Sequence, residues 1–144
     1  MKIVVVGLGY VGLSNAVLLA QKNTVIGVDT SEERVKDINT RQTPLVDAEL
    51  SQFLAEKDLQ LSASTDLKKS VKGADYVIVA TPTNYNEETN FFDTSSVETI
   101  ISQVTKIEPE ASIVVKSTIP VGFIEKISKI LETDAIMFSP EFLR

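Results

Sequence analysis

The chain has 144 residues, 43% of them hydrophobic and 24% charged, which is typical of one folded domain, and it shows neither an apolar run of roughly 18 residues nor a signal peptide. It contains no cysteine and no histidine, which excludes disulfides, thiolate nucleophiles, imidazole bases and the usual zinc ligands, so no metal site is expected. The net charge of -6 and the scattered Lys and Arg residues disfavour nucleic-acid binding. Because neither a membrane segment nor a signal peptide is predicted, we expect a cytoplasmic protein without a membrane partner.

Short β-branched runs alternate with amphipathic helical patterns along the whole chain. Strands are predicted at residues 2–6, 24–29, 59–62, 76–80, 112–116 and 135–138. Helices are predicted at residues 10–22, 31–39, 48–57, 65–71, 95–106 and 120–132. This alternation indicates an α/β fold, a Rossmann-like, doubly wound and mostly parallel sheet of six strands in the order 3-2-1-4-5-6 with helices on both faces. Ligands of such sheets bind beyond the carboxyl ends of the strands.

A glycine turn connects the first predicted strand to the first predicted helix, in the stretch GLGYVG at residues 7–12. Gly7 is expected to make the tight turn, Gly9 to let a pyrophosphate approach the backbone, and Gly12 to let the helix and strand pack closely. The unpaired N–H groups of the helix N-terminus attract phosphate. The alternative is a tight turn that binds no ligand.

The second predicted strand ends in Asp29, which is 17 residues beyond Gly12. A carboxylate near this spacing accepts hydrogen bonds from a ribose diol and repels a 2′-phosphate, so the pattern favours NAD over NADP. Arg34, on the following helix, could reach an adenosine edge or a phosphate, or simply face water.

Polar residues also follow the later strands. Thr81 and Thr83 flank Pro82 and precede a polar segment of about ten residues, which is long for such a loop. Lys116, Ser117 and Thr118 follow the fifth strand, and Glu141 follows the sixth. Each has a plain structural alternative: a surface insertion after Thr83, N-capping by Ser117 and Thr118 of a helix that opens at Pro120, and a solvated surface glutamate at 141.

Helix starts are also predicted from capping patterns. Ser95 and Glu98 have the spacing of a capping box, with Ser95 as the N-cap residue.

Five motifs, GLGYVGL, VIGVD, ATPTNYN, KSTIPVGF and SPEFLR, occur in this order along the chain. Together they resemble the amino-terminal domain of the UDP-glucose/GDP-mannose dehydrogenase family. The resemblance implies oxidation of the C6 alcohol of a nucleotide sugar to a carboxylate with two NAD in succession, with UDP-glucose as the expected substrate. GDP-mannose or a UDP-N-acetylhexosamine are the alternative substrates, and a non-catalytic NAD-sensing Rossmann module that binds a partner is the alternative function.

The resemblance also implies roles for individual residues. The implied cofactor-binding residues are Gly7, Gly9, Tyr10, Val11, Gly12, Asp29, Arg34, Thr81, Thr83 and Thr118. Thr118 and Glu141 are the implied catalytic residues, which position a water or handle a proton beside the reacting carbon. The implied substrate-binding residues are Glu141, Phe142, Leu143 and Arg144.

The sequence also departs from the family pattern. Ala48 and Glu49 stand where Pro-Gly is common, and Arg41 stands where Gly is frequent. The catalytic cysteine of the family and its later lysine and asparagine are absent. We therefore expect the cofactor-binding half of a two-domain, homodimeric enzyme, without the family's central linker helix and substrate domain. By itself this half is expected to bind NAD weakly and to turn over nothing.

Overall fold

Six short, mainly β-branched runs form one parallel sheet in the computed structural model, which describes residues 1–43, 45–56, 58–88 and 91–141. The strands are β1 (Lys2–Val6), β2 (Thr24–Val28), β3 (Leu61–Ser64), β4 (Tyr76–Val79), β7 (Ser112–Val115) and β8 (Ile136–Phe138). Their order is β3-β2-β1-β4-β7-β8, and every neighbouring pair is parallel. The Rossmann-like, doubly wound sheet predicted from the sequence is confirmed.

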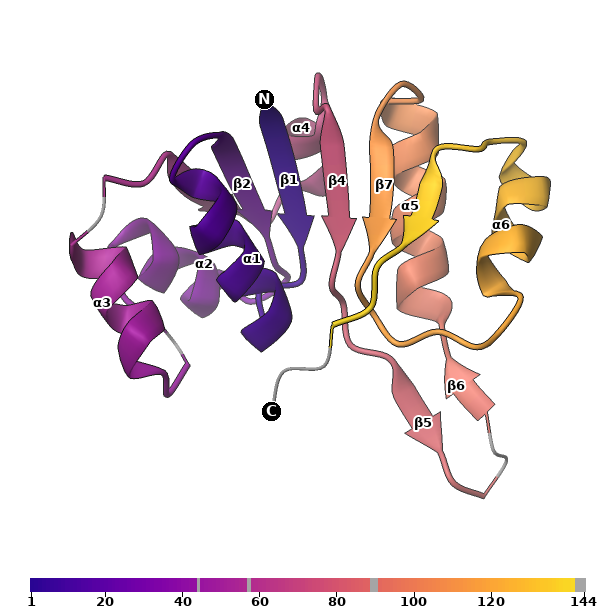
Figure 1. Ribbon diagram of the computed structural model, residues 1–144, viewed down its shortest axis with the longest axis horizontal. Helices are drawn as coiled ribbons and strands as arrows, with labels where there is room; N and C mark the ends of the chain where they lie inside the picture. Colours follow the sequence, from indigo (N-terminus) through magenta and orange to yellow (C-terminus); the bar gives the residue numbers. More distant parts are fainter. Residues whose placement is uncertain (44, 57, 89–90, 142–144) are drawn as a thin grey trace.

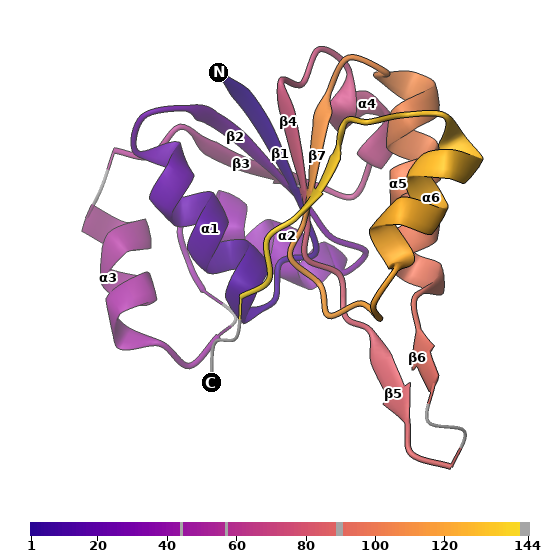
Figure 2. The same ribbon diagram turned by 45° about the vertical axis from the view of Figure 1, so that its right-hand side comes forward.

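Helices cover both faces of this sheet (Figures 1 and 2). They are α1 (Tyr10–Ala20), α2 (Glu32–Asn39), α3 (Ala48–Glu56), α4 (Leu67–Val71), α5 (Ser95–Ile107) and α6 (Phe123–Leu131). Residues of α1, α2 and α3 pack on one face, and residues of α4, α5 and α6 pack on the other. None of the helices in the described ranges is long and apolar enough to cross a membrane.

Two hydrophobic cores result, one on each side of the sheet, because successive side chains of a strand point to opposite faces. In β1, Val4 and Val6 enter the core beneath α5 and α6, whereas Ile3 and Val5 enter the core beneath α1. Both neighbours of β1, namely β2 and β4, run parallel to it, so the chain winds outward from β1 in two directions. This switch point lies at the end of β1, directly before the glycine turn, which is where ligands of doubly wound sheets bind.

A small antiparallel hairpin replaces the polar loop expected after Thr83. Its strands are β5 (Asn84–Asn86) and β6 (Phe91–Asp93), and their backbone pairing joins Asn84 to Asp93. The hairpin projects away from the sheet beyond its carboxyl edge (Figure 1). Strands of three residues are too short to show an alternating hydrophobic pattern, so the hairpin was not predictable from the sequence.

The predicted helix start at Pro120 is wrong, because α6 begins at Phe123. Gly122 precedes it with a φ of +81°, in the left-handed region, and the Phe123 N–H donates to the Pro120 carbonyl oxygen at 3.2 Å. Residues 120–123 therefore form a turn that positions the helix, and Pro120 lies before the first helical turn.

The predicted N-cap residue of α5 is also wrong by one position, because Thr94 and not Ser95 occupies it. The Thr94 hydroxyl donates to Glu98 Oε1 at 2.8 Å, and the Glu98 N–H donates to the Thr94 carbonyl oxygen at 3.0 Å. Asp93 accepts from the Ser95 N–H at 3.0 Å. No side-chain hydrogen bond from Thr94 caps the helix N–H groups, and residue spacing alone does not reveal which of two adjacent hydroxyl residues is the N-cap residue.

Candidate functional site

Two glycines of the turn after β1 are required by the protein itself. Gly7 has a φ of +91°, and a Cβ at this position would lie 2.6 Å from the Ala80 carbonyl oxygen. A Cβ on Gly12 would lie 1.7 Å from the Gly7 carbonyl oxygen. Both glycines thus make the tight turn and the close helix packing that the pattern predicts.

Gly9 differs from these two glycines, because a Cβ there would meet no atom of the described residues within 4 Å, apart from its neighbours in the chain. Gly9 is the N-cap residue of α1, and no side chain caps the first N–H groups of this helix. The beginning of α1 therefore offers backbone donors and a bare backbone to an approaching anion. This cradle fits a dinucleotide pyrophosphate.

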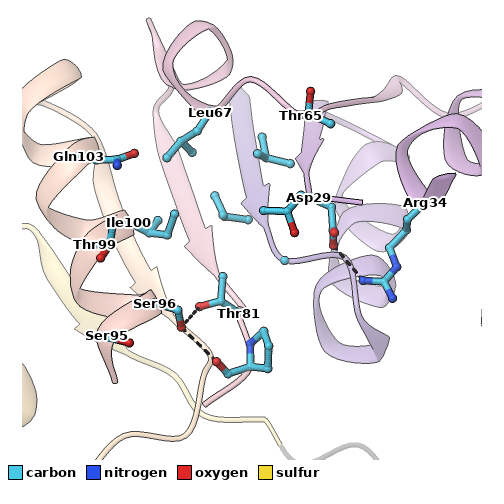
Figure 3. A pocket seen from close by; sticks show the side chains of 15 residues that line it. Asp29, Arg34, Thr65, Leu67, Thr81, Ser95, Ser96, Thr99, Ile100 and Gln103 are labelled. Atoms are coloured by element: carbon cyan, nitrogen blue, oxygen red, sulfur yellow. Dashed lines mark hydrogen bonds and ion pairs between the residues drawn. The ribbon is translucent and has the colours of Figure 1, made fainter. Parts of the chain in front are cut away.

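A cavity of about 550 Å³ opens beside the glycine turn, at the carboxyl ends of β1, β2 and β4. Four residues of the predicted site line it: Gly7, Asp29, Arg34 and Thr81. The remaining lining residues are Val6, Val28, Thr30, Thr65, Leu67, Pro82, Ser95, Ser96, Thr99, Ile100 and Gln103. Figure 3 shows Asp29 and Arg34 on one wall and the α5 side chains on the opposite wall.

The other predicted residues do not line this cavity. Those in the described ranges are Gly9, Tyr10, Val11, Gly12, Thr83, Thr118 and Glu141. Phe142, Leu143 and Arg144 lie outside the described residues.

Asp29 is held by three hydrogen bonds at the end of β2. Its Oδ2 accepts from the Leu8 N–H at 2.8 Å and from the Arg34 guanidinium at 3.0 Å, and its Oδ1 accepts from the Ser31 N–H at 3.0 Å. Burial alone would raise the pKa of this carboxyl. The N–H groups of Ser31 and Leu8, followed by the Arg34 guanidinium, outweigh burial and hold the pKa of Asp29 below its ordinary value of 3.8. Asp29 is therefore an anion at neutral pH, fixed in orientation.

Arg34 pairs with Asp29 and does not simply face water. The side chain of Arg34 is 35% exposed and that of Asp29 only 9%. Arg34 lies on α2, whose N-cap residue Ser31 accepts from the Arg34 N–H at 3.2 Å. One turn of helix thus places the guanidinium beside the cavity, where it is partly exposed.

The Thr-Pro-Thr segment after β4 is fixed by hydroxyl groups. The Ser96 hydroxyl donates to the Pro82 carbonyl oxygen at 3.1 Å and lies 3.2 Å from the Thr81 hydroxyl. The Ser117 hydroxyl donates to the Thr81 carbonyl oxygen at 2.6 Å from a buried position. The start of α5 and the end of β7 therefore hold Thr81 at the cavity rim.

Thr118 does not cap α6, and neither does Ser117, so that structural alternative is wrong. The N-cap residue of α6 is Gly122, and no side-chain hydrogen bond caps the helix. Ser117 is buried under the Thr81 backbone, whereas Thr118 is exposed at the carboxyl edge. The adjacent hydroxyls thus have different surroundings, one internal and one open to a ligand.

Glu141 is anchored on the α1 side of the sheet. Its Oε2 accepts from the Asn15 side-chain amide at 2.8 Å and lies 3.1 Å from the Lys116 ammonium group. The Asn15 hydrogen bond lowers the pKa of Glu141, burial opposes this effect, and Lys116 adds to it, so the pKa lies below its ordinary value of 4.5. The alternative of a freely solvated glutamate therefore does not hold.

Sequence reasoning missed the wall of the cavity that α5 provides. Ser96, Thr99 and Gln103 recur at three- and four-residue spacing, which places them on one helix face. This polar stripe was the available signal. No such signal existed for Asn15, because its partner Glu141 is 126 positions away in the sequence.

Comparison with known proteins agrees with this geometry. A family model described as the UDP-glucose/GDP-mannose dehydrogenase family, NAD binding domain, matches residues 1–144. The whole chain is 47% identical to a UDP-glucose 6-dehydrogenase of Streptococcus pneumoniae, of which it covers 36%. It is also 38% identical to a UDP-glucose 6-dehydrogenase of Campylobacter jejuni, of which it covers 37%.

Solved structures of related enzymes have the same fold. A UDP-D-ManNAc dehydrogenase from Pyrococcus horikoshii superposes on all of this chain with a TM-score of 0.87 at 27% identity, and 37% of that protein is covered. A GDP-mannose dehydrogenase from Pseudomonas aeruginosa, in a ternary complex, gives a TM-score of 0.84 at 29% identity, again with 37% covered. The chain spans a little more than a third of the length of these relatives. By its sequence and its fold, it belongs to the UDP-glucose/GDP-mannose dehydrogenase family and matches the NAD binding domain of that family.

Proposed function

We propose that this chain is the cofactor-binding domain of an NAD-dependent UDP-glucose 6-dehydrogenase, which oxidises the C6 alcohol of UDP-glucose to the carboxylate with two NAD in succession. The observation that carries the cofactor assignment is the partly buried Asp29 carboxylate, fixed at the cavity beside the open glycine cradle. The substrate assignment is supported by the names of the two relatives that are 47% and 38% identical.

The residues around the cavity suit the parts of NAD. The backbone of residues 7–12, with Gly9 at its open point and Tyr10 and Val11 in the first turn of α1, would hold the pyrophosphate. Asp29 would hold the adenosine ribose. A carboxylate has about four lone-pair sites, and three are occupied, so one acceptor site remains on Oδ1. Movement of Arg34 would free a second acceptor for the ribose diol.

The residues at the carboxyl edge suit the reacting end of the site. Thr81, Thr83 and Thr118 would contact the nicotinamide half of the cofactor. NAD, when bound, supplies the hydride acceptor for alcohol oxidation. Thr118 and Glu141 would handle the proton, since an ionised carboxylate is able to accept one. The substrate would be bound by Glu141, Phe142, Leu143 and Arg144, of which the last three lie outside the described residues.

Calorimetric titration of the chain with NAD, and separately with NADP, tests the cofactor assignment. We expect NAD to bind weakly and NADP to bind at least about tenfold more weakly, because Asp29 repels a 2′-phosphate. Asp29→Asn should weaken NAD binding, whereas Asp134→Asn, which removes the same charge at an exposed site, should not. Equal affinity for the two dinucleotides, or no binding of either, would contradict the proposal.

The substrate is tested on the NAD-loaded chain with UDP-glucose, GDP-mannose and UDP-N-acetylmannosamine in separate titrations. Tighter binding of UDP-glucose than of the other two supports the proposal. Tighter binding of another sugar nucleotide would contradict the UDP-glucose assignment and indicate a family member with that other substrate. We expect no NADH to form in any of these mixtures. NADH formation by the chain alone would contradict its assignment as a cofactor-binding domain that needs a second domain for turnover. The homodimer expected of the parent enzyme is likewise part of this proposal.

A further inference from the structure

One carboxylate oxygen of Glu141 has two partners from distant parts of the chain. The Asn15 Nδ2 group on α1 donates to Oε2 at 2.8 Å, and Lys116 Nζ, which follows β7, lies 3.1 Å from the same oxygen. After β8, the chain crosses toward α1 and brings Glu141 to these partners (Figures 1 and 2). Three separate segments thus meet at a single oxygen atom.

The orientation of the Asn15 side chain is fixed independently of Glu141. Its Nδ2 group also donates to the Val11 carbonyl oxygen, one helical turn earlier, at 2.8 Å. An amide nitrogen has two hydrogens, so both donors of Asn15 are used, one within α1 and one on Glu141. Because both neighbours are acceptors, the amide nitrogen must face them. The Asn15 side chain is therefore held in one orientation on α1, with its Nδ2 group as the donor.

Lys116 is held in a similar way. Its ammonium group donates to the Ser139 hydroxyl at 3.4 Å in addition to its contact with Glu141. The Lys116 side chain is 16% exposed and that of Glu141 is 31% exposed, so the ion pair is only partly screened by water. No described residue donates a hydrogen bond to the second oxygen, Oε1, of Glu141.

We propose that Asn15 is a positioning residue, which together with Lys116 fixes Oε2 of Glu141 and leaves Oε1 as the oxygen that accepts a proton from an O–H donor, either substrate hydroxyl or water. The role given to Oε1 rests on the proposed function, whereas the fixation of Oε2 does not. In the transfer, the O–H bond of the donor breaks, its electron pair stays on the donor oxygen, and the proton bonds to Oε1. Asn15 on α1 and Lys116, which follows β7, both favour the ionised form of the Glu141 carboxyl, which is the form that accepts a proton.

The arrangement also connects the two functional parts of the domain. Val11 belongs to the glycine turn region, and Asn15 joins the Val11 carbonyl to Glu141 through one side chain. The first turn of α1 therefore sets the position of the carboxylate as well as that of the cofactor cradle.

NMR titration of the 144-residue chain tests the proposal without a substitution at Asn15. The side-chain amide signals of Asn15 should shift with pH at the same midpoint as the side-chain carboxyl carbon of Glu141. In Glu141→Gln this transition should disappear. Asn23 is the internal control, because its Nδ2 group donates to the Leu19 carbonyl oxygen at 3.0 Å in the same local pattern but, among the described residues, has no carboxylate partner. A missing Asn15 transition, or one that persists in Glu141→Gln, would overturn the proposal.

Paired variants give a second readout. Asn15→Asp replaces the donor by a second carboxylate and should shift the Glu141 midpoint upward, whereas Asn23→Asp should leave it unchanged. An unchanged midpoint in folded Asn15→Asp would reject the fixation of Oε2 by Asn15. If Asn15→Asp fails to fold, Asn15→Leu, which removes the donor without adding charge, should produce an upward shift of the same sign.

The two proposals fail separately. If the unchanged chain binds no dinucleotide while the Asn15 signal follows Glu141, the proposed function is wrong and the fixation of Oε2 stands. If NAD binds but the Asn15 amide signals show no transition at the pH midpoint of Glu141, the positioning role is wrong and the proposed function stands.

Discussion

Gly12 lies so close to Gly7 that a Cβ on Gly12 would be 1.7 Å from the Gly7 carbonyl oxygen, which is impossible without a shift of the backbone. Gly9, between them in sequence, has no such neighbour. The three glycines of one motif are therefore required for different reasons. Two are demanded by the fold of the protein, whereas no contact within the described residues demands a glycine at position 9.

Substitutions should separate these reasons. We expect Gly9→Ala to change the free energy of unfolding by less than about 1 kcal/mol, since its φ of -73° suits alanine and its Cβ has space. The same variant should weaken NAD binding at least about tenfold, because the Cβ occupies the space of a phosphate. Gly12→Ala should lower the free energy of unfolding by about 3 kcal/mol. Urea denaturation and calorimetry measure both effects, and normal NAD affinity in Gly9→Ala would remove the pyrophosphate from this position.

The ion pair at Asp29 should make stability depend on pH in the acid range. Because the folded pKa of Asp29 lies below the ordinary value of 3.8, its stabilisation is fully present above pH 3.8 and is lost as the pH falls through the folded pKa. At pH 7, Asp29→Asn should lower the free energy of unfolding by about 1–3 kcal/mol, the range for hydrogen bonds to a charged group. The difference from the unchanged chain should narrow below pH 3.8. Asp134→Asn is the exposed control, and an equal loss there would assign the effect to net charge.

Alanine substitutions of the neighbouring residues Ser117 and Thr118 should change the free energy of unfolding by different amounts. Ser117→Ala removes a buried hydroxyl and leaves the Thr81 carbonyl without its 2.6 Å partner, so it should lower the free energy of unfolding by about 1–2 kcal/mol. Thr118→Ala removes an exposed side chain and should change it by less than about 0.5 kcal/mol. Thermal and urea unfolding of the two variants make the comparison. A larger loss in Thr118→Ala would mean that Thr118 is a structural residue and not one kept for a ligand.

Arg41 combines an unfavourable backbone with favourable contacts. Its φ of +63° is in the left-handed region, and its guanidinium donates to the Leu61 and Leu59 carbonyl oxygens, each at 2.9 Å. Arg41→Ala loses both hydrogen bonds but keeps the strain, so we expect a loss of about 1–3 kcal/mol in the free energy of unfolding.

Arg41→Gly is the matched variant, since it loses the same bonds and relieves the strain. It should be more stable than Arg41→Ala by about 1 kcal/mol. Glycine adopts this left-handed backbone conformation at no steric cost. Equal stability of the two variants would show that the left-handed conformation does not persist after the guanidinium is removed.

The strand order and both layers of helices were predictable, because buried parallel strands such as β1 and β7 read as continuous apolar runs. The errors lie where local signals compete or are too short. Pro120 satisfies the rule for a first helical turn, but the left-handed Gly122 after it delays α6 to Phe123. The hairpin of β5 and β6 has three residues on each side, less than any periodicity can reveal.

The residues of the site also divide into those that local sequence predicts and those whose contacts depend on the whole fold. Asp29 was predictable because its position depends on one turn and the strand that follows, all within a short stretch of chain. Its ion pair with Arg34 was not predicted, since a flexible side chain selects its partner from the final geometry. The partners of Glu141 had no local signal, because Asn15 and Lys116 come to it from other strands and helices through the fold of the whole sheet.

The bond between Asn15 and Glu141 joins residues that are 126 positions apart, and it needs β8 in place at the far edge of the sheet. Contacts of such long sequence separation are entropically costly to form early in folding. The carboxylate thus has its fixed orientation only in states in which β8 is docked at the edge of the sheet. Undocking of β8 alone would release Glu141 while β1, β2 and β4 around the glycine turn remain paired, so the two ends of the site can be lost separately.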